Sequence, residues 1–373
     1  MPRTTAALSS FVSGEFSAKL DGRTDFDKYS SGCKTLENML IHPQGAAARR
    51  VGTQFISAVK TSSLKTRLIP FEFSTTQTYI LEFGNQYIRF YKDKGQITDS
   101  GSAYEISSPY LTAELFEIKF AQSADVMYLV HKNHAVRKLS RTGHTSWTLA
   151  EVSFTDGPYL SENTTATTLT PSNASTGSRN ITASAITGIN GGVGWLATDV
   201  GRTISMNSGL AIITARTNST VVVATVSKAF SNTNAITDWK LGAFSGTTGH
   251  PSCVSFFEQR LVFAGTTAEP QTLYFSKSGD YENMTTGTNA DDAMVYTIAS
   301  NQVNEIRYLK AVRTLIVGTT GGEFTVSADG TDAAVTPTNV TIKRQSSFGS
   351  ANVDAIPAGN AVLFLQRAKR KIR

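Results

Sequence analysis

The sequence predicts a mainly β protein, an incomplete β-propeller-like array of hairpin blades. Of its 373 residues only 17% are charged, and Thr, Ser, Asn and Gly separate short β-branched and aromatic runs. Apolar and polar residues alternate in several stretches, as expected for strands with one buried face. A strand-turn-strand pattern also recurs at a nearly constant spacing, which is typical of repeated blades.

The first hairpin pattern is LIPFEFSTTQTYILEFGNQYIRFYKDKGQI, residues 68–97, in which Gly84 and Asn85 are placed to form the turn. The stretch ADVMYLVHKNHAVRKLSR repeats this pattern, with a turn at Lys132 and Asn133. The two turns are 48 residues apart (132 − 84 = 48). This distance is close to the length of a propeller blade.

Three further copies follow the middle of the chain. They are FEQRLVFAGTTAEPQTLYFSKSGD, VRTLIVGTTGGEFTVSADGT and NAVLFLQRAKRKIR. Aligning Leu261, Leu315 and Val362 gives offsets of 54 (315 − 261) and 47 (362 − 315). Blades of this size bury their faces only against neighbouring blades. The last copy stops within a blade, so we expect a C-terminal portion to be missing or made as another chain. A plain run of hairpins in a sandwich is the alternative.

Changes in composition suggest four parts. We expect an N-terminal arm with assembly contacts in 1–62, the first blades in 63–158, an inserted β-sandwich-like domain in 159–240, and further blades in 241–373. The insert differs from its surroundings because residues 161–237 include only six charged residues in 77. A disordered Ser/Thr-rich linker is the alternative, but the runs VVVATV and LAIITA favour buried strands.

Local patterns predict two short helices. Residues 9–61 show little strand periodicity, and we expect an extended arm with a short helix at residues 34–40. A second helix is expected at residues 111–120, LTAELFEIKF, with Thr112 as its N-cap. The two cysteines, Cys33 and Cys253, cannot form a disulfide framework, so both are expected to be reduced and buried.

The net charge of +6 is concentrated at the C-terminus. The last seven residues hold five Lys/Arg and no acid, so the other 366 residues sum to +1 (6 − 5). A basic tail can bind phosphates or act as an address signal, but a strand, a turn and the start of another strand fit this segment better. No membrane span or secretory signal is present in the sequence, which predicts a soluble chain made in the cytoplasm.

Residues that could carry catalysis lack the spacing that catalysis needs. For Asp291 and Asp292, nothing in the spacing brings a second carboxylate across a cleft, as acid-base hydrolysis would need. Both are expected on an exposed turn. The stretch SKSGDYENM is similar to the Asp-containing turn of sialidase propellers, but it occurs once. No phosphate-binding loop or catalytic triad has local support. We therefore expect no catalytic residues, no cofactor and no enzymatic activity.

Three histidines could in principle bind a metal. Residues i and i+3 of a strand point to opposite faces, so His131 and His134 should diverge unless the turn between them directs both to one site. We expect these two residues, like His144, to be surface residues beside turns. The sequence therefore predicts no metal site.

Residues 9–55 resemble the N-terminal signature of tail nozzle proteins of short-tailed phages, also called tail tubular protein B. The matching positions are Phe11, Gly14, Glu15, Gly22, Arg23, Asp25, Lys28, Tyr29, Asn38, Pro43, Gly45, Arg49, Arg50, Gly52 and Thr53. Later stretches agree, among them KFAQSADVMYLVH, TDGPYL and WKLGAFSGTTGHPSCVSFFEQRLVFAGT. One departure is Val51, where the family usually has proline.

The resemblance implies a structural virion protein of the phage tail, assembled in the host cytoplasm. Its subunits would form a ring, with six as the expected number, below the head-tail adaptor protein. Tail fibres or spikes would attach to this ring. Phage DNA would pass through the lumen without specific binding, and a nearly neutral body suits such a conduit because a basic wall would hold phosphates.

The charged arm is the expected assembly interface, because charge-assisted hydrogen bonds suit subunit contacts. The residues assigned to it are Glu15, Arg23, Asp25, Lys28, Tyr29, Asn38, Arg49 and Arg50. Pairing of these residues within their own chain is the competing hypothesis.

Two other functions remain open. In a receptor- or glycan-binding tail protein, Trp147, Trp195 and Trp239 could stack on sugars, although tryptophans more often fill a core. A propeller glycosidase is the third hypothesis, which the scattered carboxylates disfavour.

Overall fold

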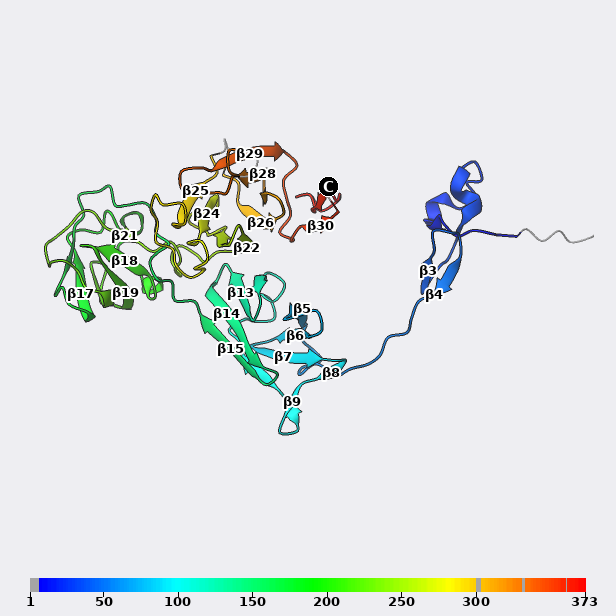
Figure 1. The fold of residues 1–373 in the computed structure, drawn as a ribbon, viewed down its shortest axis with the longest axis horizontal. Coiled ribbons are helices and arrows are strands. Elements are labelled where there is room, and N and C mark those ends of the chain that lie inside the picture. Colours follow the sequence, from blue (N-terminus) through cyan, green and yellow to red (C-terminus); the bar gives the residue numbers. More distant parts are fainter. Residues whose placement is uncertain (1–6, 300–302, 331–332, 360) are drawn as a thin grey trace, which may run out of the picture. The chain divides into compact units, whose positions relative to one another are not determined.

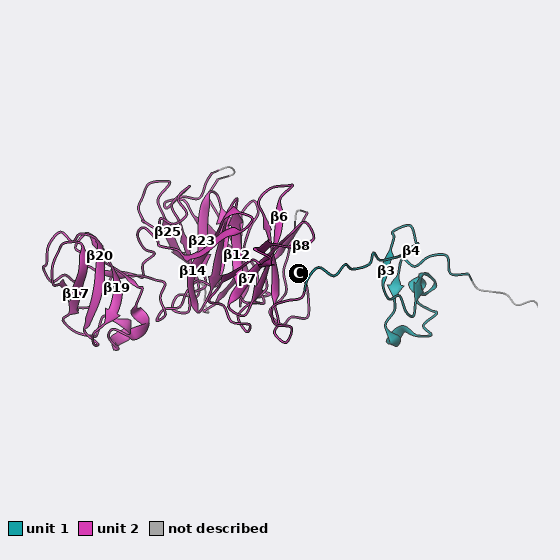
Figure 2. Ribbon diagram, turned by 90° about the horizontal axis from the view of Figure 1, so that it is seen from below, with its two compact units in different colours: residues 1–57 teal, residues 58–373 magenta. Residues whose placement is uncertain are grey.

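The computed structural model describes residues 7–299, 303–330, 333–359 and 361–373. The chain divides into two compact units, residues 1–57 and 58–373 (Figure 2). In the described residues, regular structure consists of β-strands and short 3₁₀ segments, without an α-helix, and none of it is a helix that could span a membrane. The predicted mainly β, propeller-like class is confirmed, whereas the division into four domains stays a prediction.

The unit 58–373 begins with two antiparallel sheets formed by strands close in sequence (Figure 1). The first sheet has the order β11-β7-β6-β5, with β8 also on β7, and the second has the order β12-β13-β14-β15. The strands of the first are β5 (Arg67–Glu72), β6 (Thr78–Gly84), β7 (Tyr87–Lys92), β8 (Gly95–Gln96) and β11 (Glu105–Ser107). Those of the second are β12 (Lys119–Ser123), β13 (Val126–His131), β14 (His134–Gly143) and β15 (Ser146–Glu151). A small hairpin of β9 (Thr98–Asp99) and β10 (Ser102–Ala103) follows β8.

Two more four-stranded sheets follow the insert, and a short hairpin comes last. The third sheet consists of β22 (Cys253–Phe257), β23 (Arg260–Ala264), β24 (Thr272–Phe275) and β25 (Met294–Thr297). The fourth consists of β26 (Ile306–Ala311), β27 (Leu315–Thr319), β28 (Gly322–Ser327) and β29 (Thr341–Ser346). The separate hairpin consists of β30 (Ile356–Ala358) and β31 (Ala361–Leu363). The aligned residues Leu261 and Leu315 both lie in the second strand of a sheet, so the sequence repeat corresponds to one blade.

The hydrophobic core lies between successive sheets. One cluster joins the first sheet to the second, for example through Phe90 and Leu129. A second cluster joins the second and third sheets, and a third joins the third and fourth. In the third sheet every residue of β23 is buried, as expected for a strand covered on both faces. Each blade is therefore held by its neighbours, as the repeat pattern predicts.

The insert is a six-stranded antiparallel sheet in the order β16-β17-β20-β19-β18-β21. Its strands are β16 (Leu169–Pro171), β17 (Gly177–Ala183), β18 (Thr203–Met206), β19 (Gly209–Arg216), β20 (Val221–Lys228) and β21 (Lys240–Leu241). Trp195 and Trp239 belong to a core cluster drawn entirely from this segment. The two ends of the segment are hydrogen-bonded, because the Leu160 N–H donates to the carbonyl of Leu241 at 2.9 Å.

The unit 1–57 contains short pieces of regular structure. β1 (Gly14–Glu15) pairs in parallel with β2 (Gly32–Cys33), and β3 (Met39–Ile41) forms a hairpin with β4 (Ala47–Arg49). Two 3₁₀ segments lie between β1 and β2, η1 (Ala18–Leu20) and η2 (Asp27–Ser31).

Three local predictions are wrong. The helix expected at residues 34–40 does not form, because Met39 and Leu40 pair with the other strand of the hairpin and leave too few residues for a helix. The helix expected at residues 111–120 is replaced by turns at 112–117, because β12 starts at Lys119 and uses the end of that segment for sheet pairing. Cys253 is buried as expected, but Cys33 is partly exposed.

Candidate functional site

The predicted assembly residues pair with one another inside the unit 1–57. Arg23 donates two hydrogen bonds of 2.7 Å to the carboxylate of Asp25, and this contact lowers the pKa of Asp25. Arg50 Nε donates to Asn38 Oδ1 at 2.8 Å, across the ends of the β3–β4 hairpin. Both pairs stay exposed to solvent. Whether they also contact another chain stays a prediction.

The other predicted residues stabilise turns or lie at the surface. Glu15 Oε2 accepts the N–H of Leu36 at 2.7 Å, and the Tyr29 hydroxyl accepts the N–H of Gly22 at 3.1 Å. Lys28 and Arg49 are exposed, the first in η2 and the second in β4. These residues therefore shape the unit, and their side chains remain accessible.

The described part of the unit 1–57 has no fully buried apolar side chain, although Phe16 packs on Phe26 and Tyr29. Among its described residues, only the glycines at 14, 32 and 45 are buried. Nine of its larger apolar side chains are exposed, and the exposed fraction reaches 83% for Val51 and 80% for Phe55. The exposed apolar set is Leu8, Val12, Phe26, Met39, Leu40, Ile41, Val51, Phe55 and Ile56. Exposed apolar side chains gathered in this way are typical of surfaces that pack against a partner.

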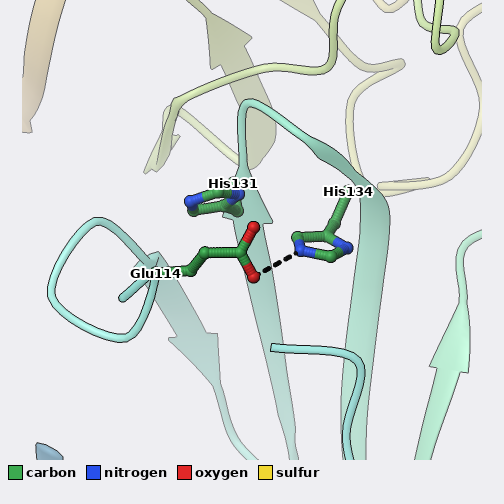
Figure 3. Close-up of side chains that lie close together, drawn as sticks. All are labelled: Glu114, His131 and His134. Carbon is green, nitrogen blue, oxygen red and sulfur yellow. Dashed lines mark hydrogen bonds and ion pairs between the residues drawn. The ribbon is translucent and has the colours of Figure 1, made fainter. Parts of the chain in front are cut away.

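A second candidate site lies in the second sheet, where Glu114 reaches toward His131 and His134 (Figure 3). Each of the three residues offers a ligand atom, and these atoms lie within 4.8 Å of one another. Glu114 comes from the turn before β12, and the histidines flank the turn between β13 and β14. The hydrogen bond between Glu114 Oε2 and His134 Nε2 measures 2.8 Å.

The expected divergence of the two histidines is wrong. His131 and His134 are directly paired residues at the end of a two-residue hairpin, and their ring centroids are 5.2 Å apart. Directly paired residues of neighbouring strands point to the same face of the sheet, whereas the i, i+3 rule holds only within one strand. Neither histidine is a fully exposed surface residue, and His131 is 1% exposed. His144 lies elsewhere, with its Nδ1 2.7 Å from the hydroxyl of Tyr79.

The surroundings favour a carboxylate beside a neutral imidazole. Burial alone would raise the pKa of Glu114, but hydrogen bonds from the Leu111 N–H and from His134 outweigh it, so this pKa is lowered. Burial lowers the pKa of His131, although the charge of Glu114 opposes the shift. The lone pair of His131 is at Nδ1, which accepts the N–H of Asn133 at 3.2 Å. The proton of the neutral ring is therefore on Nε2.

Two buried polar atoms at this cluster have no hydrogen-bond partner among the described residues. They are His131 Nε2 and the hydroxyl of Tyr110. The Tyr110 ring meets both histidines edge-on, at 6.4 Å from His131 and 5.1 Å from His134. Local pattern does not reveal Glu114 or Tyr110 as site residues, because only the packing of separate turns brings them to the histidines.

A pocket of about 520 Å³ lies beside the insert. Its lining is rich in hydroxyl and amide groups, including Ser161, Asn163, Thr187, Thr247 and Thr248. All three tryptophans considered for sugar stacking are buried in cores, although Trp239 also contributes to the lining of this pocket. Lys277 lies between the carboxylates of Asp291 and Asp292, at 3.0 and 3.6 Å.

Comparisons with known proteins find a similar solved structure but no matching family. No family profile matches the chain, and no curated protein does. Among solved structures, the chain is similar to the phage phi92 endosialidase, with 10% identity and a TM-score of 0.29. The match covers 84% of this chain and 54% of that one, so the chain spans about half the length of this neighbour. The expectation that the chain is not an enzyme is contradicted by this neighbour, which is an enzyme, and is withdrawn.

Proposed function

We propose that this chain is a protein of a phage tail and that its N-terminal unit attaches it to other subunits. In its specific form the proposal is a nozzle subunit in a ring of six, below the adaptor and carrying fibres or spikes, through which DNA passes. The observation that carries the attachment is the unit 1–57, which exposes nine apolar side chains and fully buries only glycines among its described residues. The resemblance of residues 9–55 to tail nozzle proteins supports the specific form.

Replacing three exposed apolar residues of this unit should weaken assembly strongly. In the triple variant Leu40→Ser, Val51→Ser and Phe55→Ser, each change removes about 1.5–3 kcal/mol of burial at an interface. Assembly should therefore weaken at least about 100-fold, since 1.4 kcal/mol is a factor of ten. The monomer fold should be unaffected because these side chains are already exposed. Light scattering and negative-stain electron microscopy measure the result, alone and with the tail neighbours.

The matched control is Leu68→Ser, which changes an exposed apolar residue in β5 of the larger unit and should leave assembly intact. A wild-type chain that stays monomeric alone and with its tail neighbours would refute the attachment. An assembly other than a ring would refute the nozzle form only. Arg49→Ala with Arg50→Ala tests the charged contacts, and an intact ring in that variant would remove them from the interface.

A receptor- or glycan-binding tail protein is the second candidate. The observation that favours it is the pocket beside the insert, whose hydroxyl and amide lining suits sugar hydroxyls and whose size is typical of ligand sites. Polymers of sialic acid belong among the test glycans, because the similar solved structure is named as an endosialidase. A reducing-sugar assay on the same polymers tests for cleavage.

Filling this pocket should prevent glycan binding. Thr187→Arg places a long side chain in the lining and should remove signals on a glycan array. Thr182→Arg makes the same change on an exposed position of β17 outside the pocket and should retain them. Array signals that survive Thr187→Arg would exclude the pocket, and a wild-type chain without any signal would remove the candidate.

A further inference from the structure

We propose that Glu114, His131 and His134 bind a divalent transition metal, for which Zn²⁺ is the best match. Nothing in the proposed tail function requires this site. Two imidazoles and one carboxylate form a common zinc ligand set, with a fourth position left for water. Mg²⁺ and Ca²⁺ fit poorly, because these ions prefer oxygen ligands alone.

The backbone already brings the three side chains together. The hairpin holds His131 and His134 in direct register, and Glu114 comes from the turn that leads into β12 of the same sheet. The ligand atoms lie within 4.8 Å of one another, whereas ligands at about 2.0–2.2 Å around a tetrahedral ion are about 3.4 Å apart. Closing this difference takes movements of about an ångström in side chains at turns.

The orientation of His131 suits a ligand. Its Nδ1 carries the lone pair, and its Nε2–H lies 3.6 Å from Glu117 Oε2. Histidine ligands commonly bind a metal with one nitrogen and donate the other N–H to a carboxylate. The ion would replace the weak contact of Nδ1 with the Asn133 N–H, and a small closure would complete the hydrogen bond to Glu117.

A purely structural hydrogen bond explains only part of the cluster. It accounts for Glu114 and His134, which are 2.8 Å apart. It leaves His131 Nε2 unpaired in a side chain that is 1% exposed, and the nearby Tyr110 hydroxyl is unpaired too. Unpaired buried polar atoms are costly, and closure of the ligands around an ion on Nδ1 would bring the Nε2–H of His131 onto Glu117 Oε2 and so pair one of the two.

Calorimetric titration with Zn²⁺ tests the site. The protein used is the full chain without a histidine tag, first dialysed against EDTA and then freed of it. The wild type should bind one Zn²⁺ per chain. Glu114→Gln and His134→Gln should each weaken binding at least about 100-fold. Glu117→Gln removes the carboxylate beside His131 Nε2 together with an ion pair to Lys132, and should weaken binding by about 10–100-fold.

The matched control is His42→Gln, an exposed histidine of the unit 1–57, which should bind like the wild type. Circular dichroism establishes that each variant is folded. Titration with Co²⁺ gives a second readout, because an ion held by these ligands produces visible absorption bands that Glu114→Gln should remove. Failure of the wild type to bind Zn²⁺, or equal affinity in Glu114→Gln, His134→Gln and the wild type, would overturn the proposal.

Discussion

Replacing Asp199 by alanine should lower the free energy of unfolding by about 3–5 kcal/mol, the cost of leaving a buried charge without its partner. Asp199 and Arg202 form an ion pair of 3.0 Å, with side chains 0% and 1% exposed. Burial lowers the pKa of Arg202, and the charge of Asp199 opposes that shift. Without Asp199 the guanidinium would stay buried with too little negative charge beside it.

The carboxylate of Asp199 also holds the loop before β18. It accepts hydrogen bonds of 2.7 Å from the Leu196 N–H and from the amide of Asn190. Arg202 in turn donates to the carbonyl of Gly242 at 2.9 Å, at the end of the insert. The substitution therefore releases several contacts at once.

Urea unfolding, followed by tryptophan fluorescence, measures this loss, because Trp195 and Trp239 lie in the same core. The control is Glu162→Ala, which removes the exposed pair with Lys240 and should cost about 0–1 kcal/mol. Asp199→Asn retains an acceptor oxygen for the Leu196 N–H, so its loss of stability should lie between those of Asp199→Ala and Glu162→Ala. A loss for Asp199→Ala no larger than that for Glu162→Ala would contradict the expectation.

Replacing Trp147 by alanine should cost about 3–5 kcal/mol, the usual range for removing a buried aromatic side chain. Its side chain is in the core between the first two sheets and is 5% exposed. The ring stacks on Phe90 at 4.5 Å and meets Phe71 edge-on at 4.8 Å, between ring centroids. Its Nε1–H donates to the carbonyl of His144 at 3.1 Å.

Chemical denaturation monitored by circular dichroism measures the effect. Trp147→Phe should recover part of the stability, because a smaller ring keeps some contacts. Phe116→Ala removes an exposed aromatic residue and should stay within about 0.5 kcal/mol of the wild type. Equal stability of Trp147→Ala and Phe116→Ala would show that the two sheets do not depend on this core.

Much of the blade pattern could be predicted because each hairpin is local. The turn expected at Gly84 and Asn85 lies at residues 85–86, between β6 and β7. The failed helices lie where the chain instead forms a strand that pairs with the next strand along the sequence. Lys119, for example, is directly paired with Val130, and this pairing overrides the helical preference of the preceding residues.

The histidine pair could also have been predicted from the hairpin. The turn at Lys132 and Asn133 was expected, and it places the flanking residues opposite each other. The sequence pattern leaves open a turn that directs both side chains to one site, but the alternation rule of a single strand favours divergence. Glu114 could not be predicted, since its approach depends on how a separate turn packs against that hairpin.

Because its two ends are joined, the insert could be replaced as one unit. Tyr159 and Gly242 form a bridge where this segment leaves and re-enters the blades, and the core it encloses is its own. A change of length or topology inside such a loop need not disturb the strands on either side. Lineages could then replace this segment, and with it any recognition surface it carries, while keeping the supporting scaffold unchanged.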